Sequence, residues 1–239
     1  LLATRMDRAN PHAASALNKL GLALQSLAPQ ISHHIAQSAS SMSGESQKQD
    51  PAYLQSLQVL TLAWAENKKV RIWHRSERDG ALHPYVISPY FIEPYAIGQS
   101  TYLFGACEPQ NEIMNFKIER IEKAEALEED YRVPPDFDPQ VILADAWGIW
   151  FTGSEPVEVV LKFHPRVAHR VRETRWHRSE QTELQEDGSL LWRAFIAEPR
   201  EMMPWVRGWG ADVEVLAPAS MRQELTQEAL EIMNVYFKP

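Results

Sequence analysis

The 239-residue sequence lacks several features on which whole functional classes depend. It has a single cysteine, Cys107, which excludes an internal disulfide and fits a reducing compartment. No apolar run approaches the roughly 20 residues of a membrane span, and no basic-then-apolar leader opens the chain. The GxSxG, P-loop and HExxH patterns of common enzyme sites are also missing. We therefore expect a cytoplasmic protein that is no enzyme, stays off membranes and needs no cofactor or metal.

An excess of positive charge is missing as well. The net charge is −8, and residues 122–239 carry thirteen cationic against twenty-two anionic side chains. Affinity for duplex DNA comes largely from neutralising phosphates, so an acidic chain binds it poorly. We therefore expect contact with duplex promoter DNA only through a domain outside this sequence.

Residues 1–50 are predicted to form a helical linker or dimerisation segment. A helix starts at Asn10 and Pro11, and Pro29 should kink or break it. Two interpretations stay open, namely a helix packed on its own domain and a linker helix that dimerises. Residues 39–50 are rich in Ser and Gln and are predicted to be a loop. The heptad-like apolar stripe of the helix is Leu17, Leu20, Leu24, Leu27, Ile31 and Ile35.

Residues 51–130 are predicted to form a small barrel. A helix over residues 53–67 precedes short strands near residues 70–74, 83–88, 90–93, 101–107 and 115–121. Turns are expected at Asp79-Gly80 and at Gly98. One helix followed by about five antiparallel strands is typical of an SH3-like or Sm-like barrel.

A Pro-rich boundary then leads to a second domain. Residues 131–153 are predicted to be a linker with a helix. Residues 154–239 show the order strand, helix, strand, strand, helix, strand and a closing helix, with a hairpin at Asp187-Gly188. This order predicts a ferredoxin-like α/β sandwich, and the whole chain is placed in the α+β class.

Aromatic and cationic side chains recur through the predicted barrel strands. Cations neutralise phosphates and aromatic faces stack bases, so such a surface suits a single-stranded nucleic acid, a nucleotide or another anionic molecule. The alternative is that the aromatics are barrel core and that the cations pair with Glu93, Glu112 and Glu119. The candidate ligand residues are Arg71, Trp73, Arg75, His83, Tyr90, Tyr102, Lys117 and Arg120.

A second candidate group lies near the end of the chain. Arg207 stands between Trp205 and Trp209, which indicates cation–π stacking or an interface anchor. Packing of both tryptophans in a core is the competing interpretation. Trp205 and Arg207 complete the predicted ligand-binding set.

Residues 55–239 resemble the bacterial transcriptional regulators that contain a WYL domain. The later segment is similar to the hallmark of the C-terminal extension domain of these proteins. Thr101 stands where the family has the Trp of its name triplet, and Met114 lies where relatives often place an arginine, which leaves the ligand type open. The segments that carry the resemblance are residues 89–90 (PY), 102–105 (YLFG), 116–121 (FKIERI) and 205–218 (WVRGWGADVEVLAP).

The resemblance implies a winged helix-turn-helix, an Sm-like WYL barrel that senses a ligand, and a ferredoxin-like extension. It also implies a homodimer, with single-stranded DNA as the barrel ligand in some members. We therefore predict the ligand-sensing and dimerising region of a regulator whose helix-turn-helix lies elsewhere. A protein-interaction module without a nucleic-acid ligand is the alternative.

Overall fold

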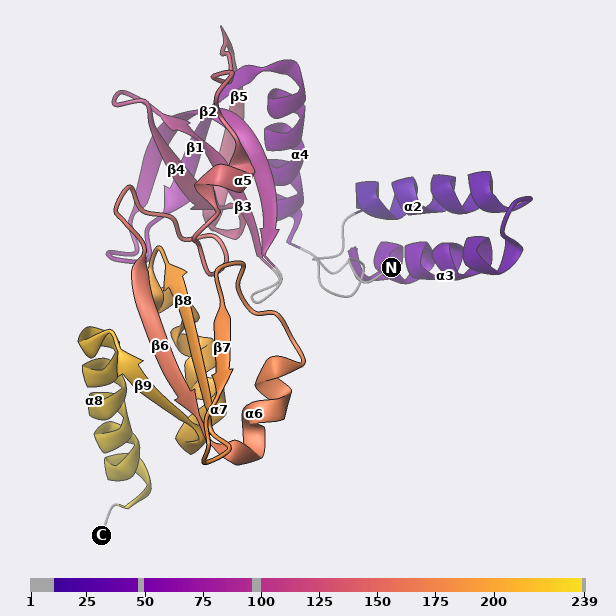
Figure 1. The fold of residues 1–239 in the computed structure, drawn as a ribbon. Helices are drawn as coiled ribbons and strands as arrows, with labels where there is room; N and C mark the ends of the chain where they lie inside the picture. The colour runs from indigo at the N-terminus through magenta and orange to yellow at the C-terminus, as the bar shows by residue number, and fades with distance from the viewer. Residues whose placement is uncertain (1–10, 47–49, 96–99, 238–239) are drawn as a thin grey trace. The chain divides into compact units, whose positions relative to one another are not determined.

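A computed structural model describes residues 11–46, 50–95 and 100–237 of the chain. The chain divides into two units, residues 1–137 and residues 138–239 (Figure 1). Each unit combines helices with one antiparallel sheet, so the predicted α+β class is confirmed. Within the described residues, no helix is long and apolar enough to cross a membrane. The predicted helix cap at Asn10 and turn at Gly98 lie outside the described residues.

The first described elements of this unit are two antiparallel helices, α2 (Pro11–Leu24) and α3 (Pro29–Ser46) (Figure 1). The helix is interrupted before Pro29, as predicted. The first helix ends at Leu24, and α3 starts at Pro29 and runs back along α2. The two helices approach closely at Gly21, whose carbonyl accepts a hydrogen bond from the Ser32 hydroxyl at 2.7 Å. The predicted loop over residues 39–50 was wrong for residues 39–46, since α3 continues to Ser46 and buries Met42 against α2. Residues 47–49 lie outside the described residues.

The helix α4 (Pro51–Glu66) covers one face of a five-stranded sheet. Asp50 caps α4 by accepting a hydrogen bond from the Ala52 N–H at 2.9 Å. The strand order is β4-β3-β2-β1-β5. Strands β1 to β4 therefore pair in the order of the sequence, and β5 returns to pair with β1. The strands are β1 (Lys68–Arg75), β2 (Leu82–Tyr95), β3 (Ser100–Cys107), β4 (Glu112–Lys117) and β5 (Ile121–Asp130), with the 3-10 turn η2 (Ile118–Arg120) before β5.

The sheet curls into the predicted Sm-like barrel. Strands β1 and β4 are not hydrogen-bonded neighbours, yet the His74 ring of β1 lies 5.4 Å from the Phe116 ring of β4. Leu60 of α4 and Val70, Ile72 and Leu103 of the strands are fully buried together inside. Two predicted strands are one continuous β2 with an irregular register at Pro89, and residues 121–130 add a strand that was not predicted.

A second aromatic cluster packs on the sheet face opposite Leu103. Phe91 and Phe104 stack with centroids 4.3 Å apart, and Phe137 lies 5.8 Å from Phe91. The Tyr131 hydroxyl donates a hydrogen bond to the Pro89 carbonyl. The segment after β5 therefore folds back and closes this side of the unit.

The second unit contains a four-stranded antiparallel sheet of order β7-β8-β6-β9. Helices α6 and α7 pack on one face, where Phe163, Trp192 and Val206 are buried. This order and the βαββαβ sequence are those of the predicted ferredoxin-like sandwich. The elements are α5 (Pro139–Ile142), β6 (Val157–Phe163), α6 (Pro165–Arg172), β7 (Gln181–Leu184), β8 (Leu190–Ile196), η3 (Pro199–Met202), α7 (Met203–Trp209), η4 (Gly210–Asp212), β9 (Val213–Ala217) and α8 (Ala219–Tyr236).

A buried carboxylate ties the chain before β6 to this core. Glu201 is 7% exposed, and its oxygens accept three backbone N–H groups. The donors are Gly148 at 2.9 Å, Ile149 at 2.7 Å and Trp150 at 3.1 Å. Charge-assisted hydrogen bonds of this kind compensate the burial of a negative charge.

Candidate functional site: an aromatic and cationic row on the barrel

The outer face of β1 presents Arg71, Trp73 and Arg75 in one row. Alternation along the strand turns Val70 and Ile72 into the core and these three residues outward. Opposite Trp73, the neighbouring strands contribute Pro84 of β2 and Lys123 of β5. The Lys123 ammonium lies 4.8 Å from the centre of the Trp73 ring, which is a cation–π contact.

The cations of the row differ in how they are neutralised. Arg75 donates to the Glu122 carboxylate at 2.8 Å through Nε and to the Gly80 carbonyl at 2.7 Å. The Lys123 ammonium pairs with Glu125 at 2.5 Å. Arg71 is exposed and has no hydrogen-bond or ion-pair partner among the described residues. Arg71 is therefore the cation of the row that is most available to a ligand.

Two more predicted residues, His83 and Arg120, lie at the end of the barrel where β1 turns into β2. Arg120 pairs with Glu77 at 2.8 Å, and His83 pairs with Asp79 at 3.1 Å. Hydrogen bonds from the Ala81 N–H, the Ser76 hydroxyl and His83 lower the pKa of Asp79 to about 2. An anionic ligand here would compete with carboxylates that are already in place. Arg75 and Arg120 thus pair with acidic residues, as the alternative interpretation expected, and their partners are Glu122 and Glu77.

His74 lies beside this group but turns toward the barrel interior. Burial, and next the charge of Arg120, lower its pKa below the ordinary value. The ring is therefore neutral at pH 7 and offers no positive charge to an anion. Its Nε2 atom is buried and has no hydrogen-bond partner among the described residues.

Tyr102 and Lys117 form a separate pair on the far side of the sheet. They lie opposite each other on β3 and β4, and the Tyr102 ring contacts Tyr95 at 6.1 Å. Two strands, β2 and β3, separate β4 from β1 in the sheet order. Lys117 and Arg71, both in the predicted ligand set, therefore do not lie on neighbouring strands.

Tyr90 is placed in the second aromatic cluster and not on the open surface. It is 7% exposed, and its ring lies 4.7 Å from Phe137 and 6.1 Å from Tyr131. Burial raises the pKa of its hydroxyl. Its position is that of a packing residue.

In the second unit, Trp205 and Arg207 point to different surroundings. Trp205 packs among Trp147, Trp176 and Trp192 with ring centroids 4.9, 5.0 and 5.7 Å away. Arg207 instead pairs with Glu224, at 3.2 Å, and with Glu228 on α8. The cation over Trp209 is Arg170 of α6, at 5.3 Å from the ring centre. No stacking of Arg207 between the two tryptophans is observed.

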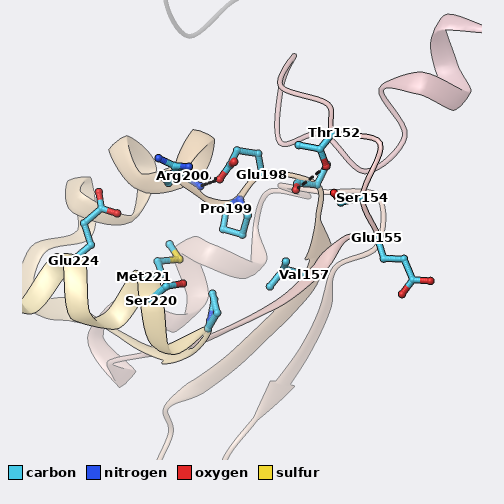
Figure 2. Close-up of a pocket in the computed structure, with 12 residues that line it drawn as sticks. Thr152, Ser154, Glu155, Val157, Glu198, Pro199, Arg200, Ser220, Met221 and Glu224 are labelled. Carbon is cyan, nitrogen blue, oxygen red and sulfur yellow. Dashed lines mark hydrogen bonds and ion pairs between the residues drawn. The ribbon is translucent and has the colours of Figure 1, made fainter. Parts of the chain in front are cut away.

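A cavity of about 510 Å³ in the second unit was not predicted (Figure 2). It lies between the start of β6, the start of η3 and the first turn of α8. Glu155, Glu198 and Glu224 line it, and Arg200 pairs with Glu198 at 3.4 Å. This acidic lining does not suit an anionic effector. The described residues hold no group of three or more His, Cys, Asp or Glu side chains able to bind a metal.

Sequence reasoning missed Lys123 as a member of the row. Its strand, β5, is rich in acidic residues and carries no apolar alternation strong enough to be predicted. The signal that identifies it is the cross-strand register with Trp73.

The comparisons with known proteins agree with this architecture. Two family models match, the WYL domain over residues 55–126 and the WCX domain over residues 155–233. Comparison with curated proteins finds no match. All four segments that carry the resemblance lie within the matched spans, three in the WYL domain and residues 205–218 in the WCX domain.

Two solved structures are similar to this chain at low identity. Proteasome accessory factor B/C (PafBC) of Arthrobacter aurescens is 18% identical, with 96% of this chain and 36% of that chain covered and a TM-score of 0.40. A CRISPR Cas-related protein is 14% identical, with 77% and 51% covered and a TM-score of 0.52, which shows a shared fold. The chain thus spans about a third to a half of these proteins. The chain therefore contains a WYL domain followed by a WCX domain.

Proposed function

We propose that the chain is the ligand-sensing and dimerising region of a cytoplasmic WYL-type transcriptional regulator. Its barrel binds single-stranded DNA, a nucleotide or a similar anionic effector, and it acts by binding and not by catalysis. The presence of WYL and WCX domains supports a regulatory sensing role. Effector binding shifts the equilibrium between subunit arrangements and so changes the promoter affinity of a DNA-binding domain outside these residues.

The observation that carries this proposal is the row on β1. Arg71 offers a guanidinium with no carboxylate to displace, and Trp73 offers an aromatic face two residues along the same strand. Lys123 holds one side of the Trp73 ring while its ammonium pairs with Glu125, so Arg71 supplies the available positive charge. Single-strand binding needs this combination of phosphate neutralisation and base stacking.

We propose a smaller set of ligand residues than the sequence predicted. Arg75, His83 and Arg120 are paired with carboxylates, and Tyr90 is buried. We therefore assign the main contact to Arg71 and Trp73. Arg75 contributes only where a phosphate displaces Glu122.

The test is fluorescence anisotropy of a labelled single-stranded oligonucleotide over a salt series. Replacing Trp73 by Ala should weaken binding by about 5-fold to 150-fold, since each stacked base contributes roughly 1–3 kcal/mol. Arg71→Ala removes one phosphate contact, so the slope of log affinity against log salt should fall by about 0.7. Trp73→Ala should leave that slope unchanged.

Arg132→Ala is the matched control, because Arg132 is exposed in the same unit and the substitution changes the charge equally. It should leave affinity and slope near the wild-type values. Equal losses for Arg71→Ala and Arg132→Ala, or no binding by the wild type at low salt, would contradict the nucleic-acid proposal.

A further inference from the structure

The C-terminal helix α8 is packed at its start and uncovered toward its end. Met221 in the first turn is 4% exposed, and the same face then carries Leu225, Ala229, Ile232 and Tyr236 at steps of four, four, three and four. Exposure along this face rises to 57% at Ile232 and 80% at Tyr236. The second half of α8 (yellow in Figure 1) therefore exposes an apolar face that its own unit does not cover.

A groove of about 600 Å³ runs beside this uncovered half, within the second unit. The helix itself forms one wall through Leu225, Ala229 and Ile232. The opposite wall comes from α7 and from β9, which is an edge strand of the sheet. The apolar side chains that line the groove are Val206, Val213, Val215, Leu225, Ala229 and Ile232.

The charged groups at the rim are already neutralised within the chain. Arg207 pairs with Glu224 and Glu228, and Arg222 pairs with Glu214 at 2.9 Å. A charged occupant would have to break these pairs, whereas an uncharged one leaves them intact. The groove therefore suits an apolar segment with little charge.

The second half of α8 is itself such a segment. Residues 229–237 (ALEIMNVYF) contain a single charge, Glu231, which accepts a hydrogen bond from Gln227 at 2.9 Å. Six large apolar side chains of this segment are 52–80% exposed, namely Leu230, Ile232, Met233, Val235, Tyr236 and Phe237. The chain thus carries both the groove and a segment with the properties of its occupant.

We propose that a second copy of this chain occupies the groove with the second half of its α8, and that the exchange is reciprocal. Two α8 helices then run antiparallel about a two-fold axis and cross near Ala229, whose small side chain allows close approach. A self-complementary patch of this kind closes a dimer. This inference rests on the dimerising part of the proposed function and names the surface responsible.

The exposed apolar side chains on the face of Ala229 supply the area of the dimer. Ile232, Met233, Tyr236 and Phe237 lie within about 80° of Ala229 around the helix, whereas Leu230 and Val235 point to its sides. Standard interfaces bury about 1,200–2,000 Å² in total, so the eight side chains of two copies, with the grooves that receive them, reach the lower value at about 150 Å² each. Tyr236 and Phe237 reach that share, since buried aromatics contribute about 150–250 Å² each.

The first measurement is analytical ultracentrifugation of the full chain across a concentration series. The wild type should sediment as a dimer, and Ala229→Lys should raise its dissociation constant by at least about 100-fold, because a lysine ammonium would be buried without a partner. Gln227→Lys is the control, since residue 227 lies about 200° around the helix from Ala229 and has the same charge change. Ala229 is exposed in the single chain, so circular dichroism should show both variants folded.

The second measurement tests the crossing point. Oxidation of Ala229→Cys should give a disulfide-linked dimer, while Gln227→Cys should stay uncrosslinked; the native Cys107 is buried and does not compete. A monomeric wild type would overturn both this inference and the dimeric part of the proposed function. A dimer that tolerates Ala229→Lys and resists crosslinking would overturn only the α8 surface, and the oligonucleotide titration stays a separate test of the effector.

Discussion

Arginine and tryptophan alternate at two places in this chain, with opposite structural outcomes. At residues 71–75 they lie on a strand, so Arg71, Trp73 and Arg75 share the solvent face. At residues 205–209 they lie on the helix α7, where Trp205 and Trp209 face the core together and Arg207 turns toward α8. The same spacing therefore builds a surface row in the barrel and a packed core in the second unit.

The difference follows from the two backbone periodicities. A strand repeats every two residues, so positions separated by two share a face, whereas on a helix positions separated by four do. Residues two apart in sequence can therefore be assigned to one surface only after the secondary structure is known. The comparison predicts that substitutions in the tryptophan core reduce stability strongly and that substitutions in the barrel row hardly affect it.

The largest expected effect is that of Trp205→Ala. Trp205 contacts five other aromatic rings, so its removal leaves a cavity and should lower the free energy of unfolding by about 3–5 kcal/mol. Urea unfolding followed by circular dichroism measures the loss. Trp205→Phe should recover part of it. If Trp205→Ala lowers the free energy of unfolding no more than Trp73→Ala does, the tryptophan core and the barrel row do not differ in their contribution to stability.

A smaller loss is expected from Glu201→Gln. The amide nitrogen of Gln cannot accept a hydrogen bond, so at least one of the three backbone N–H donors at residues 148–150 loses its partner. We expect a decrease of about 2 kcal/mol in the free energy of unfolding. Glu186→Gln, on an exposed turn, is the control and should have no measurable effect. Equal stabilities of the two variants would mean that Glu201 does not anchor this segment.

Local rules were enough to predict much of the fold. Asp79-Gly80 and Asp187-Gly188 end in glycines with φ of 67° and 79°, as hairpin turns require. The order of strands and helices after residue 154 predicted the ferredoxin-like sheet, because few topologies satisfy it. The α3 residues 39–46 were missed because their helix depends on burying Met42 against α2, which outweighs a Ser-rich composition.

The candidate site was harder to predict because its contacts join distant residues. Tyr90 has a polar tip and looks available in sequence, but Tyr131 and Phe137, some forty residues later, bury it. Arg75 pairs with Glu122, and Arg120 pairs with Glu77. These partners are set by strand register and turn geometry, which the distance along the sequence does not reveal. Alternation along β1 correctly predicted that Arg71 and Trp73 share one face of the strand, because this inference needs no knowledge of which residues contact them.

Tyr131→Phe should show that the barrel has a packed aromatic region of its own. The variant leaves the Pro89 carbonyl without its donor, and a loss of about 1 kcal/mol is expected. Burial raises the pKa of Tyr131 to about 12, above the value of about 10 in an unfolded chain. Because the folded-state pKa is raised, this stabilisation is complete below pH 10 and declines as pH rises toward 12. Tyr131→Phe should weaken this alkaline decline, and an unchanged pH profile would contradict the assignment.

The smallest effect is expected from Arg75→Ala, at the exposed end of the row. Its ion pair with Glu122 is about half exposed on both sides, and surface pairs contribute roughly 0–1 kcal/mol. The free energy of unfolding should therefore change by less than about 1 kcal/mol. Losing the cation also leaves the Glu122 carboxylate, next to Lys123 in the chain, without its arginine partner. The loss of oligonucleotide binding free energy in Arg75→Ala should therefore exceed its loss of unfolding free energy. Glu122→Gln removes the negative charge instead and should raise the affinity. A stability loss as large as that of Trp205→Ala would place Arg75 among the structural residues and end the distinction between the two arginine–tryptophan alternations.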